Sequence, residues 1–359
     1  MPEIAPEDHR VYVESKVKDP TVSVVVPVYN MESKGYLDDL LESLASQSLE
    51  RIEFLLVDDA STDESLKRML EFAEGRSDTS VISMRRNSRQ GAARNRGIVH
   101  ARGRYVGFVD GDDVVEPDYY RFLYERAAET GSDIVVASFV HVDDHLGNRG
   151  RPILPLRGFR MGTIGDALRK QLIGNPFHVV SAIYRGGLFG KESTLFPEGV
   201  QFEDNPATFR VMMSARSIDV VDRVEGALYL YRQSSTSTDH RRDNLEETVA
   251  YRISTSQMLI DDAKSSGYYE AYRDEIDLYF IRLAALNTLG KAKRFGDISK
   301  STARFIADVT KKSIHPLNRN GSFSNLSMTK RAQVILCLYF PDLYMAIRIA
   351  DGKRNNQHD

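Results

Sequence analysis

The sequence is poor in cysteine and in long apolar runs, and both absences narrow the class of protein. Its only cysteine is Cys337, so no disulfide can form within the chain, and we expect a protein of the reducing cytoplasm. Residues 1–20 are polar and mixed in charge, without the apolar segment of a signal peptide, so we expect none. The longest apolar run near the C-terminus, Val334 to Phe340, is much shorter than the roughly 20 residues that cross a bilayer as a helix.

Strong net charge and a glycine-rich dinucleotide motif are also missing. The formal net charge of −3 gives no overall attraction to nucleic acid, so we expect no nucleic-acid partner. The first strongly apolar run is followed by Tyr29-Asn-Met-Glu-Ser33. A dinucleotide-dependent oxidoreductase would carry G-x-G-x-x-G at this position, so that class is excluded.

The composition and the order of apolar segments predict an α/β fold. With 42% hydrophobic and 28% charged residues among 359, the chain can form one large globular domain and a smaller one. Short apolar runs alternate with helical patterns up to about residue 140, which predicts βαβ units and a Rossmann-like, mostly parallel sheet with flanking helices. We expect strands at 21–28, 52–57, 80–84, 104–109 and 133–137, and helices at 36–47, 61–73, 91–100 and 117–130.

The pattern changes twice further along the chain. Between residues 141 and 240 short strands, such as 179–184, mix with helices and turns, and we assign this stretch to the same domain. From Leu245 the apolar residues have helical spacing. The expected organisation is a lead-in at 1–20, a main α/β domain at 21–240 and a helical region at 241–359.

The segment Asp110-Gly111-Asp112-Asp113 carries the clearest chemical signal, directly after a predicted strand. Three neighbouring carboxylates repel one another unless a cation neutralises them. Hard oxygen ligands suit Mg²⁺ or Mn²⁺, which proteins usually share with substrate phosphates. The carboxyl ends of strands in an open α/β sheet are also where ligands bind. The alternative is a solvated acidic turn, because Asp and Gly are common turn residues.

Residues suited to binding a nucleotide follow the other predicted strands. Tyr29 ends the first strand and could stack on a flat base, while Asp59 ends the second and could accept from a base imide N–H. A predicted helix opens near Gly91, where its N-terminus favours an anion, and Arg94 lies one turn into it. Ordinary turns, helix capping by Ser61 and an exposed basic helix face are the structural alternatives.

Two later segments could supply a proton acceptor and further ligands. Glu203-Asp204 lies between turn signals and could hold a general base, although Asp204 could instead cap a helix at 206–213. Arg232 could clamp a diphosphate. His240 could be a third metal ligand.

Taken in order, these segments resemble the family-2 glycosyltransferases of the GT-A fold. The matching segments cover residues 21 to about 235, and each is weak alone, whereas five in this order and spacing are specific. They are residues 24–30, 57–63, 91–97, 103–113 and 203–204. Gly111 stands where many relatives have Ser. Residues 241–359 are much less diagnostic.

The resemblance implies a role for each matching residue. The nucleotide base, most often uracil, would be held by Pro27, Tyr29, Asn30 and Asp59. Arg94 would lie near the base or the diphosphate. The acidic segment matches the DxD motif: Asp110 would face the ribose or the metal, and Asp112 would ligate the metal. Asp204 would be the inverting base, supported by Glu203.

We therefore expect an inverting glycosyltransferase that depends on Mn²⁺ or Mg²⁺. It would move a hexosyl or N-acetylhexosaminyl group from a nucleotide-sugar donor to a hydroxyl of a glycan, glycolipid or cell-wall polymer. A sugar nucleotidyltransferase is one alternative, but it would carry a loop rich in Gly and Lys or Arg after the first strand. A non-catalytic sugar-nucleotide-binding protein is the other, and the intact Asp110, Asp112 and Asp204 argue against it.

The C-terminal tail combines positive charge with apolar residues. Residues 311–355 contain eight Lys or Arg against two acids, a local charge of 8 − 2 = +6. Between Arg331 and Arg348 the apolar residues are Val334, Ile335, Leu336, Leu338, Tyr339, Phe340, Leu343, Tyr344 and Ile347. This combination predicts a peripheral contact of residues 329–354 with the inner face of the plasma membrane. Packing on the protein's own helices and a homo-oligomer contact are the alternatives.

Overall fold

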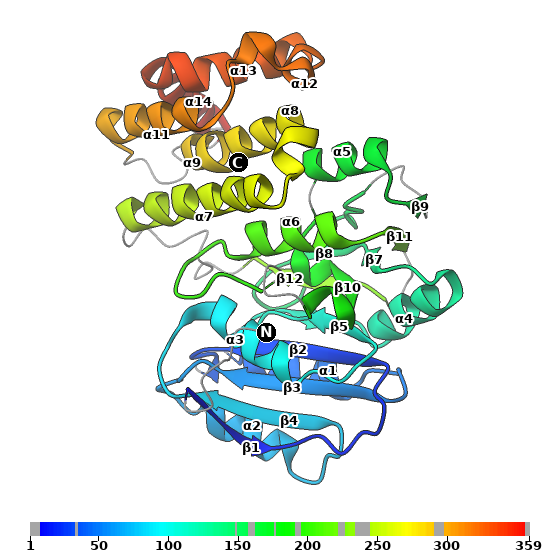
Figure 1. Cartoon of the computed structure of the whole chain (residues 1–359). Helices are drawn as coiled ribbons and strands as arrows, with labels where there is room; N and C mark the ends of the chain where they lie inside the picture. Colours follow the sequence, from blue (N-terminus) through cyan, green and yellow to red (C-terminus); the bar gives the residue numbers. More distant parts are fainter. Residues whose placement is uncertain are drawn as a thin grey trace. The chain divides into compact units, whose positions relative to one another are not determined.

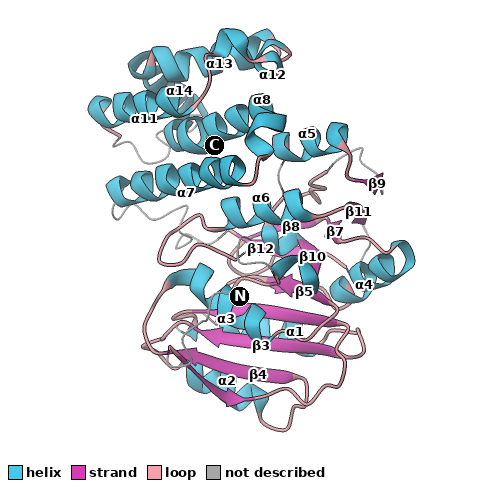
Figure 2. Ribbon diagram, in the orientation of Figure 1, coloured by secondary structure: helices cyan, strands magenta, loops and turns pink. Residues whose placement is uncertain are grey.

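The structure is a computed structural model and falls into two compact units, residues 1–240 and 241–359. It describes residues 8–32, 35–147, 149–156, 162–175, 177–190, 195–221, 227–233, 245–290 and 298–355. Figure 1 follows the chain through both units, and Figure 2 shows that the strands belong to the first. Each unit is described here by itself.

The described part of the first unit is built on a nine-stranded sheet in the order β1-β4-β3-β2-β5-β10-β7-β11-β9. The four strands β4, β3, β2 and β5 run parallel, as the alternating pattern predicts. β10 lies antiparallel between β5 and β7, and β11 is parallel to β7. The bounds are β1 His9–Val13, β2 Val22–Val28, β3 Ile52–Asp58, β4 Thr79–Met84, β5 Tyr105–Phe108, β7 Ile134–Ala137, β9 Gly162–Thr163, β10 Ala182–Arg185 and β11 Ser217–Val221.

A smaller three-stranded sheet has the order β6-β12-β8. It consists of β6 Val114–Val115, β8 Phe139–Val142 and β12 Tyr229–Arg232. β6 follows the acidic segment 110–113 directly, and β12 pairs with it in antiparallel fashion. The smaller sheet therefore holds the far end of the acidic segment in place.

Helices cover the main sheet because its central strands are mostly apolar and buried on both faces. All seven residues of β2 and of β3 are buried. α3 packs against β2 and β3, and α2 packs against β4. A Cβ atom at Gly97 would lie 2.3 Å from Val25 Cγ1, so glycine permits the close approach of α3 to β2. The helices are α1 Tyr36–Ala45, α2 Ser65–Ala73, α3 Arg89–His100, α4 Tyr119–Thr130, α5 Asp166–Gly174 and α6 Asp204–Ser214.

Two segments of the first unit differ from the sequence prediction. No strand was assigned to residues 1–20, whereas β1 pairs antiparallel with β4. β1 is an edge strand whose residues alternate between half-buried and exposed, so it lacks the continuous apolar run that marks β2. The strand predicted at 179–184 begins as a 3₁₀ turn, Val179–Ser181, and the strand itself is β10.

The described part of the second unit is helical. Its helices are α7 Leu245–Ser265, α8 Tyr268–Phe280, the π-helical turn η5 Ile281–Leu286, α9 Asn287–Gly290, α11 Lys300–Ser313, η6 Leu317–Arg319, α12 Gly321–Ser324, α13 Met328–Tyr339 and α14 Pro341–Asn355. Figure 1 shows α11, α13 and α14 close together, and they pack on one another. Pro341 begins α14, a position that tolerates proline because its missing N–H would have no helical partner. Within the described ranges, no helix is both long and apolar enough to cross a membrane.

Candidate active site

The carboxyl ends of β3, β2 and β5 lie side by side because these strands are parallel neighbours. The Asp59 N–H donates to the carbonyl of Val28 over 2.8 Å, which joins the ends of β3 and β2. Gly111 is buried, and a Cβ atom on it would lie 2.9 Å from the carbonyl oxygen of Pro27. Glycine therefore lets the acidic segment after β5 approach the end of β2. The structure thus brings three of the predicted motifs together at one edge of the sheet.

Tyr29 and Asn30 follow Pro27 at this edge. Tyr29 is 41% exposed, so its ring can be reached by a ligand. The Asn30 N–H donates to Ser61 Oγ over 3.1 Å, and Asn30 Oδ1 accepts from the Thr62 N–H over 2.8 Å. Asn30 thereby ties the loop after β2 to the loop after β3, which fixes the surroundings of Tyr29.

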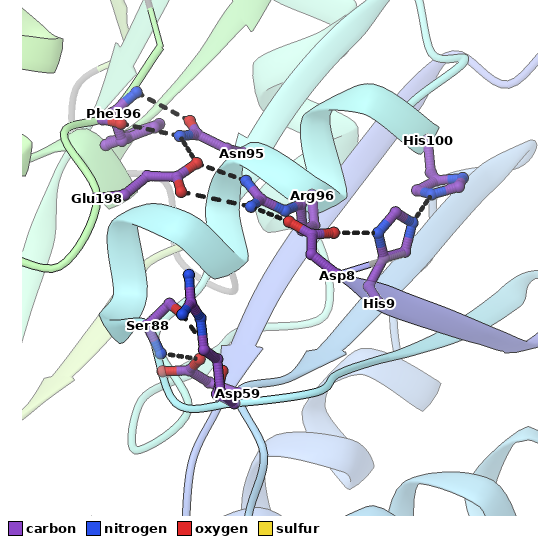
Figure 3. A network of polar contacts seen from close by, with 10 residues as sticks. Asp8, His9, Asp59, Ser88, Asn95, Arg96, His100, Phe196 and Glu198 are labelled. Carbon is purple, nitrogen blue, oxygen red and sulfur yellow. Dashed lines mark hydrogen bonds and ion pairs between the residues drawn. The ribbon is translucent and has the colours of Figure 1, made fainter. Parts of the chain in front are cut away.

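The two carboxylates after β3 hold neighbouring loops. Asp58 accepts from the Ser61 N–H over 3.0 Å and from the Ser83 hydroxyl over 2.8 Å. Asp59 accepts from the Ser88 N–H over 2.8 Å, at the start of α3 (Figure 3). Burial raises the pKa of Asp59 to about 6, against the effect of the amide hydrogen bonds. Asp59 therefore lies at the end of β3, where the nucleotide base is expected to bind, and it also anchors the start of α3.

Arg94 joins the acidic segment to the start of α6. Its guanidinium is buried, with Nη2 2.6 Å from Asp110 Oδ1 and Nη1 bonded to Glu203 Oε1. The Arg94 Cζ atom lies 5.3 Å from the ring centroid of Phe196. Arg94 Nε is buried without a hydrogen-bond partner among the described residues. The Arg94 guanidinium thus lies between Asp110, on the predicted donor side of the site, and Glu203, on the side of the predicted general base.

Glycine again permits a close approach where α3 meets the segment before α6. A Cβ atom on Gly91 would lie 2.2 Å from the carbonyl oxygen of Pro197 and 3.0 Å from Glu203 Cγ. Gly91 was predicted to favour an anion at a helix N-terminus. Its evident structural effect is to let Glu203 reach Arg94.

Glu203 and Asp204 lie at the N-terminus of α6. Glu203 occupies the N-cap position without a side-chain capping bond, and Asp204 begins the helix, so capping by Asp204 does not account for this pair. Burial raises the pKa of Glu203 to about 7, although Arg94 opposes the shift. Burial also raises the pKa of Asp204, against the effects of Arg94 and His178. Carboxyl groups that titrate closer to neutrality are suited to accepting a proton.

Asp113 and Arg232 form hydrogen bonds that hold the acidic segment in place. Asp113 is buried, and it accepts from the Tyr229 hydroxyl over 2.6 Å and from the Arg232 N–H over 2.7 Å. The Arg232 guanidinium donates to the Asp112 carbonyl over 2.7 Å, to the Asp39 carboxylate over 2.8 Å and to the Asp144 carbonyl. Arg232 was predicted to clamp a diphosphate, whereas these contacts show a buried side chain that holds the acidic segment. His240, the predicted third metal ligand, lies outside the described residues.

The oxygen-rich donor set at this edge fits a magnesium or manganese ion. No group of three or more His, Cys, Asp or Glu side chains in the described part of the chain is arranged to hold a metal by itself. One oxygen of Asp110 is engaged by Arg94, and Asp113 is buried in its own hydrogen bonds. Asp112 and the other oxygen of Asp110 would be the ligands of such a cation. Mg²⁺ is commonly bound by one or two carboxylates together with substrate phosphates and water.

A second polar network, which the sequence did not reveal, also holds α3 in place (Figure 3). The side chain of Asn95 bonds both the N–H and the carbonyl of Phe196, over 2.9 and 2.8 Å. Arg96 is buried and forms ion pairs with Glu198 and Asp8. These pairs join residues about 90 to 100 positions apart, so no local pattern could have shown them.

An α/β sheet with the acidic segment Asp110-Gly111-Asp112 and a nearby carboxylate pair is the arrangement expected of a glycosyltransferase of the GT-A fold. The model of the family described as "Glycosyl transferase family 2" matches residues 23–194, and this part of the chain belongs to that family. The family expected from the sequence is thereby confirmed. The expected α/β fold with flanking helices is confirmed as well, although the main sheet is mixed rather than mostly parallel.

Among the relatives, the chain is 33% identical to the "Uncharacterized glycosyltransferase EpsJ" of Bacillus subtilis over 224 residues, which are 61% of this chain and 62% of EpsJ. It is 28% identical to the "Putative glycosyltransferase EpsH" of the same organism over 78% of this chain and 80% of EpsH. The chain thus spans just under two thirds of EpsJ. The solved structure of residues 1–349 of TarS from S. aureus is similar in fold, with a TM-score of 0.62 and 21% identity over 94% of this chain and 92% of that one.

Proposed function

We propose that this protein transfers a hexosyl or N-acetylhexosaminyl group from a nucleotide-sugar donor to a hydroxyl of a glycan, glycolipid or cell-wall polymer. The first unit is the catalytic domain in this proposal. The supporting observation is that Arg94 joins Asp110 and Glu203 in one buried cluster. In this cluster the acidic segment lies beside a pair of carboxyls with raised pKa values, which supports the proposal.

The donor is a UDP-sugar in this proposal. Tyr29, exposed at the end of β2, stacks on the base, and Asp59 accepts from its imide N–H. Pro27 and Asn30 shape the same pocket through the backbone. TarS, whose fold this chain shares, has been solved with UDP-GlcNAc and with UDP, so UDP-sugars are the first donors to test.

The residues of the acidic segment hold the diphosphate end of the donor. A Mn²⁺ or Mg²⁺ ion held by Asp112 and Asp110 would act as a Lewis acid that offsets the charge growing on the leaving diphosphate. Arg94 supports this arrangement by fixing Asp110. Gly111 keeps the segment against the end of β2.

Asp204 accepts the proton of the attacking hydroxyl, and Glu203 supports it through Arg94. Burial raises the pKa of both carboxyls, which makes the ionised Asp204 a stronger base toward the acceptor hydroxyl. One base and one in-line attack replace the diphosphate on the opposite face of the anomeric carbon. The proposed outcome is therefore inversion of configuration.

The acceptor class and the cytoplasmic location belong to the proposal as well. The acceptor class rests on family membership. The location rests on the single cysteine, Cys337, which is free and buried, an arrangement suited to a reducing compartment.

A donor screen tests the proposal. UDP-, GDP- and dTDP-sugars are incubated with the protein and Mn²⁺, and release of the nucleoside diphosphate is measured with and without a chelator. We expect release from at least one UDP-sugar and its loss with the chelator. Absence of release from every donor would contradict the proposal. Formation of pyrophosphate from UTP and a sugar 1-phosphate would instead identify a nucleotidyltransferase.

A further inference from the structure

The C-terminal helices α13 and α14 have two apolar faces, and only one of them is covered. The inner face contributes Val334, Cys337, Leu338, Tyr344 and Met345 to the core of the second unit. The outer face exposes Ile335 by 40%, Tyr339 by 52%, Phe340 by 55%, Leu343 by 52% and Ile347 by 41%. We call these five residues the α13–α14 apolar surface. The packing alternative for the tail thus accounts for one face and leaves the other unexplained.

The spacing of these residues makes the surface continuous. Ile335 and Tyr339 are four residues apart on α13, and Leu343 and Ile347 are four apart on α14, so each pair lies on one side of its helix. Phe340 lies between the two helices. A groove of about 430 Å³ runs between α11 and this junction, and Tyr339, Phe340 and Leu343 line it together with Arg304 and Lys311. Several exposed apolar side chains on neighbouring turns are typical of a binding surface rather than of scattered exposed residues.

The part of the chain that carries this surface is positively charged. Residues 298–350 contain eight Lys or Arg and two acids, a charge of 8 − 2 = +6, while the whole chain has −3, which leaves −9 for the rest. The two acids are already paired, Asp342 with Arg304 and Asp308 with Lys311. Residues 298–350 are therefore basic in a chain that is otherwise acidic, and two of their basic side chains, Arg304 and Lys311, line the groove beside the surface, so an anionic partner fits this part of the chain.

We propose that the α13–α14 apolar surface binds the headgroup region of an anionic bilayer as a peripheral contact. Leu343 and Ile347 would enter the boundary of the acyl region, and Tyr339 suits the interface because its ring is apolar and its hydroxyl is polar. The basic side chains would contact the anionic headgroups. A second copy of the chain fits less well, because an isologous contact would bring two surfaces of charge +6 together.

The membrane contact is independent of the transfer reaction in residues and in test. Every residue assigned to the active site lies in the first unit, whereas the surface belongs to α13 and α14 of the second. Substitutions of exposed residues are preferable to removing the tail, because a truncation would also take Val334, Cys337 and Leu338 from the core.

Two matched pairs of variants test the two parts of the surface in the full chain. The apolar variant Leu343→Gln/Ile347→Gln has the control Tyr12→Gln/Ile153→Gln, which changes side chains of the first unit exposed by 42% and 39%. The charge variant Lys311→Gln/Lys312→Gln has the control Lys16→Gln/Lys18→Gln, which removes the same charge elsewhere. Binding is measured by co-sedimentation with phosphatidylglycerol-containing and with pure phosphatidylcholine vesicles, at low and high salt.

We expect the unmodified protein to bind the anionic vesicles and to bind the neutral ones far more weakly. The charge variant should lose affinity by roughly fivefold for each basic residue removed, about 25-fold for the pair. The apolar variant should lose more than about tenfold, and both controls should bind normally. The apolar part should persist in high salt, whereas the electrostatic part is screened.

Three results would overturn the membrane assignment. One is failure of the unmodified protein to sediment with anionic vesicles. Another is an equal loss of binding in a variant and its control. The third is a concentration-dependent dimer, seen by sedimentation velocity, that Leu343→Gln/Ile347→Gln dissociates, because the surface would then be a contact between copies of this chain.

Discussion

Replacing Arg94 by Met removes the cation that joins the two halves of the candidate active site. Met keeps an unbranched apolar stem beside Phe196 but leaves Asp110 and Glu203 without their partner. These two side chains are only 20% and 7% exposed, so water cannot fully replace the guanidinium. Removing one partner of a buried ion pair typically costs about 3–5 kcal/mol, and we expect a loss of folding stability in that range.

A surface arginine provides the control. Arg68 is 43% exposed and pairs with Asp38 and Glu71, so Arg68→Met should cost less than about 1 kcal/mol. The double variant Arg94→Met/Glu203→Gln should be more stable than Arg94→Met alone, because the amide removes the uncompensated buried charge. This non-additivity is the signature of direct coupling between the two residues.

The stability is measured by urea unfolding followed by circular dichroism, and the second unit is identical in all three variants. The measurement also has a pH dependence with a defined sign. Burial raises the pKa of Glu203 to about 7, and Arg94 opposes this shift. Without Arg94, the pKa of Glu203 in the folded variant should therefore be higher still. The loss of folding stability in Arg94→Met should therefore be largest above pH 8, where Glu203 must be ionised. It should decrease as Glu203 takes up a proton on acidification. Equal costs for Arg94→Met and Arg68→Met at pH 8 would refute the reasoning.

Three further predictions concern donor binding. Asp112→Ala should abolish the effect of Mn²⁺ on UDP affinity in calorimetric titration, and an unchanged response would show that the cation binds elsewhere. Arg232→Met should leave the Asp112 and Asp144 carbonyls without their donor, which should lower the folding stability by about 1–3 kcal/mol and weaken UDP binding. Normal UDP binding would show that Arg232 is not needed to hold the acidic segment in place. UDP affinity should fall as the pH drops through about 6, because Asp59, whose pKa is raised to about 6, can no longer accept from the imide once protonated. Asp59→Asn should bind weakly at all these pH values, and a wild-type profile in this variant would exclude the role.

The central sheet and the acidic segment were predictable because their signals are local. β2 and β3 are rich in consecutive apolar residues, as is typical of parallel strands that are buried on both faces. The sequence Asp110-Gly111-Asp112 brings several carboxylates together within a few residues. Such features need no knowledge of the rest of the chain.

The pairing inside the site was not predictable, because it joins distant residues. Arg94 and Glu203 are 109 positions apart, and their contact depends on the close approach of backbone at Gly91. Arg232 has the same chemistry as a phosphate-binding arginine, and only its burial against Asp39 and two carbonyls reveals its structural role. β1 was missed because an edge strand with alternating exposure resembles a polar N-terminal segment.

The transfer rate of Asp204→Asn tests the account of the active site most directly. The amide keeps the size and most of the hydrogen bonding of the carboxyl but cannot accept a proton. With a donor and acceptor from the screen, donor affinity by calorimetry should stay near that of the unmodified protein, while the transfer rate should fall by roughly 10²–10⁴-fold. A normal transfer rate in this variant would contradict the assignment of Asp204 as the base.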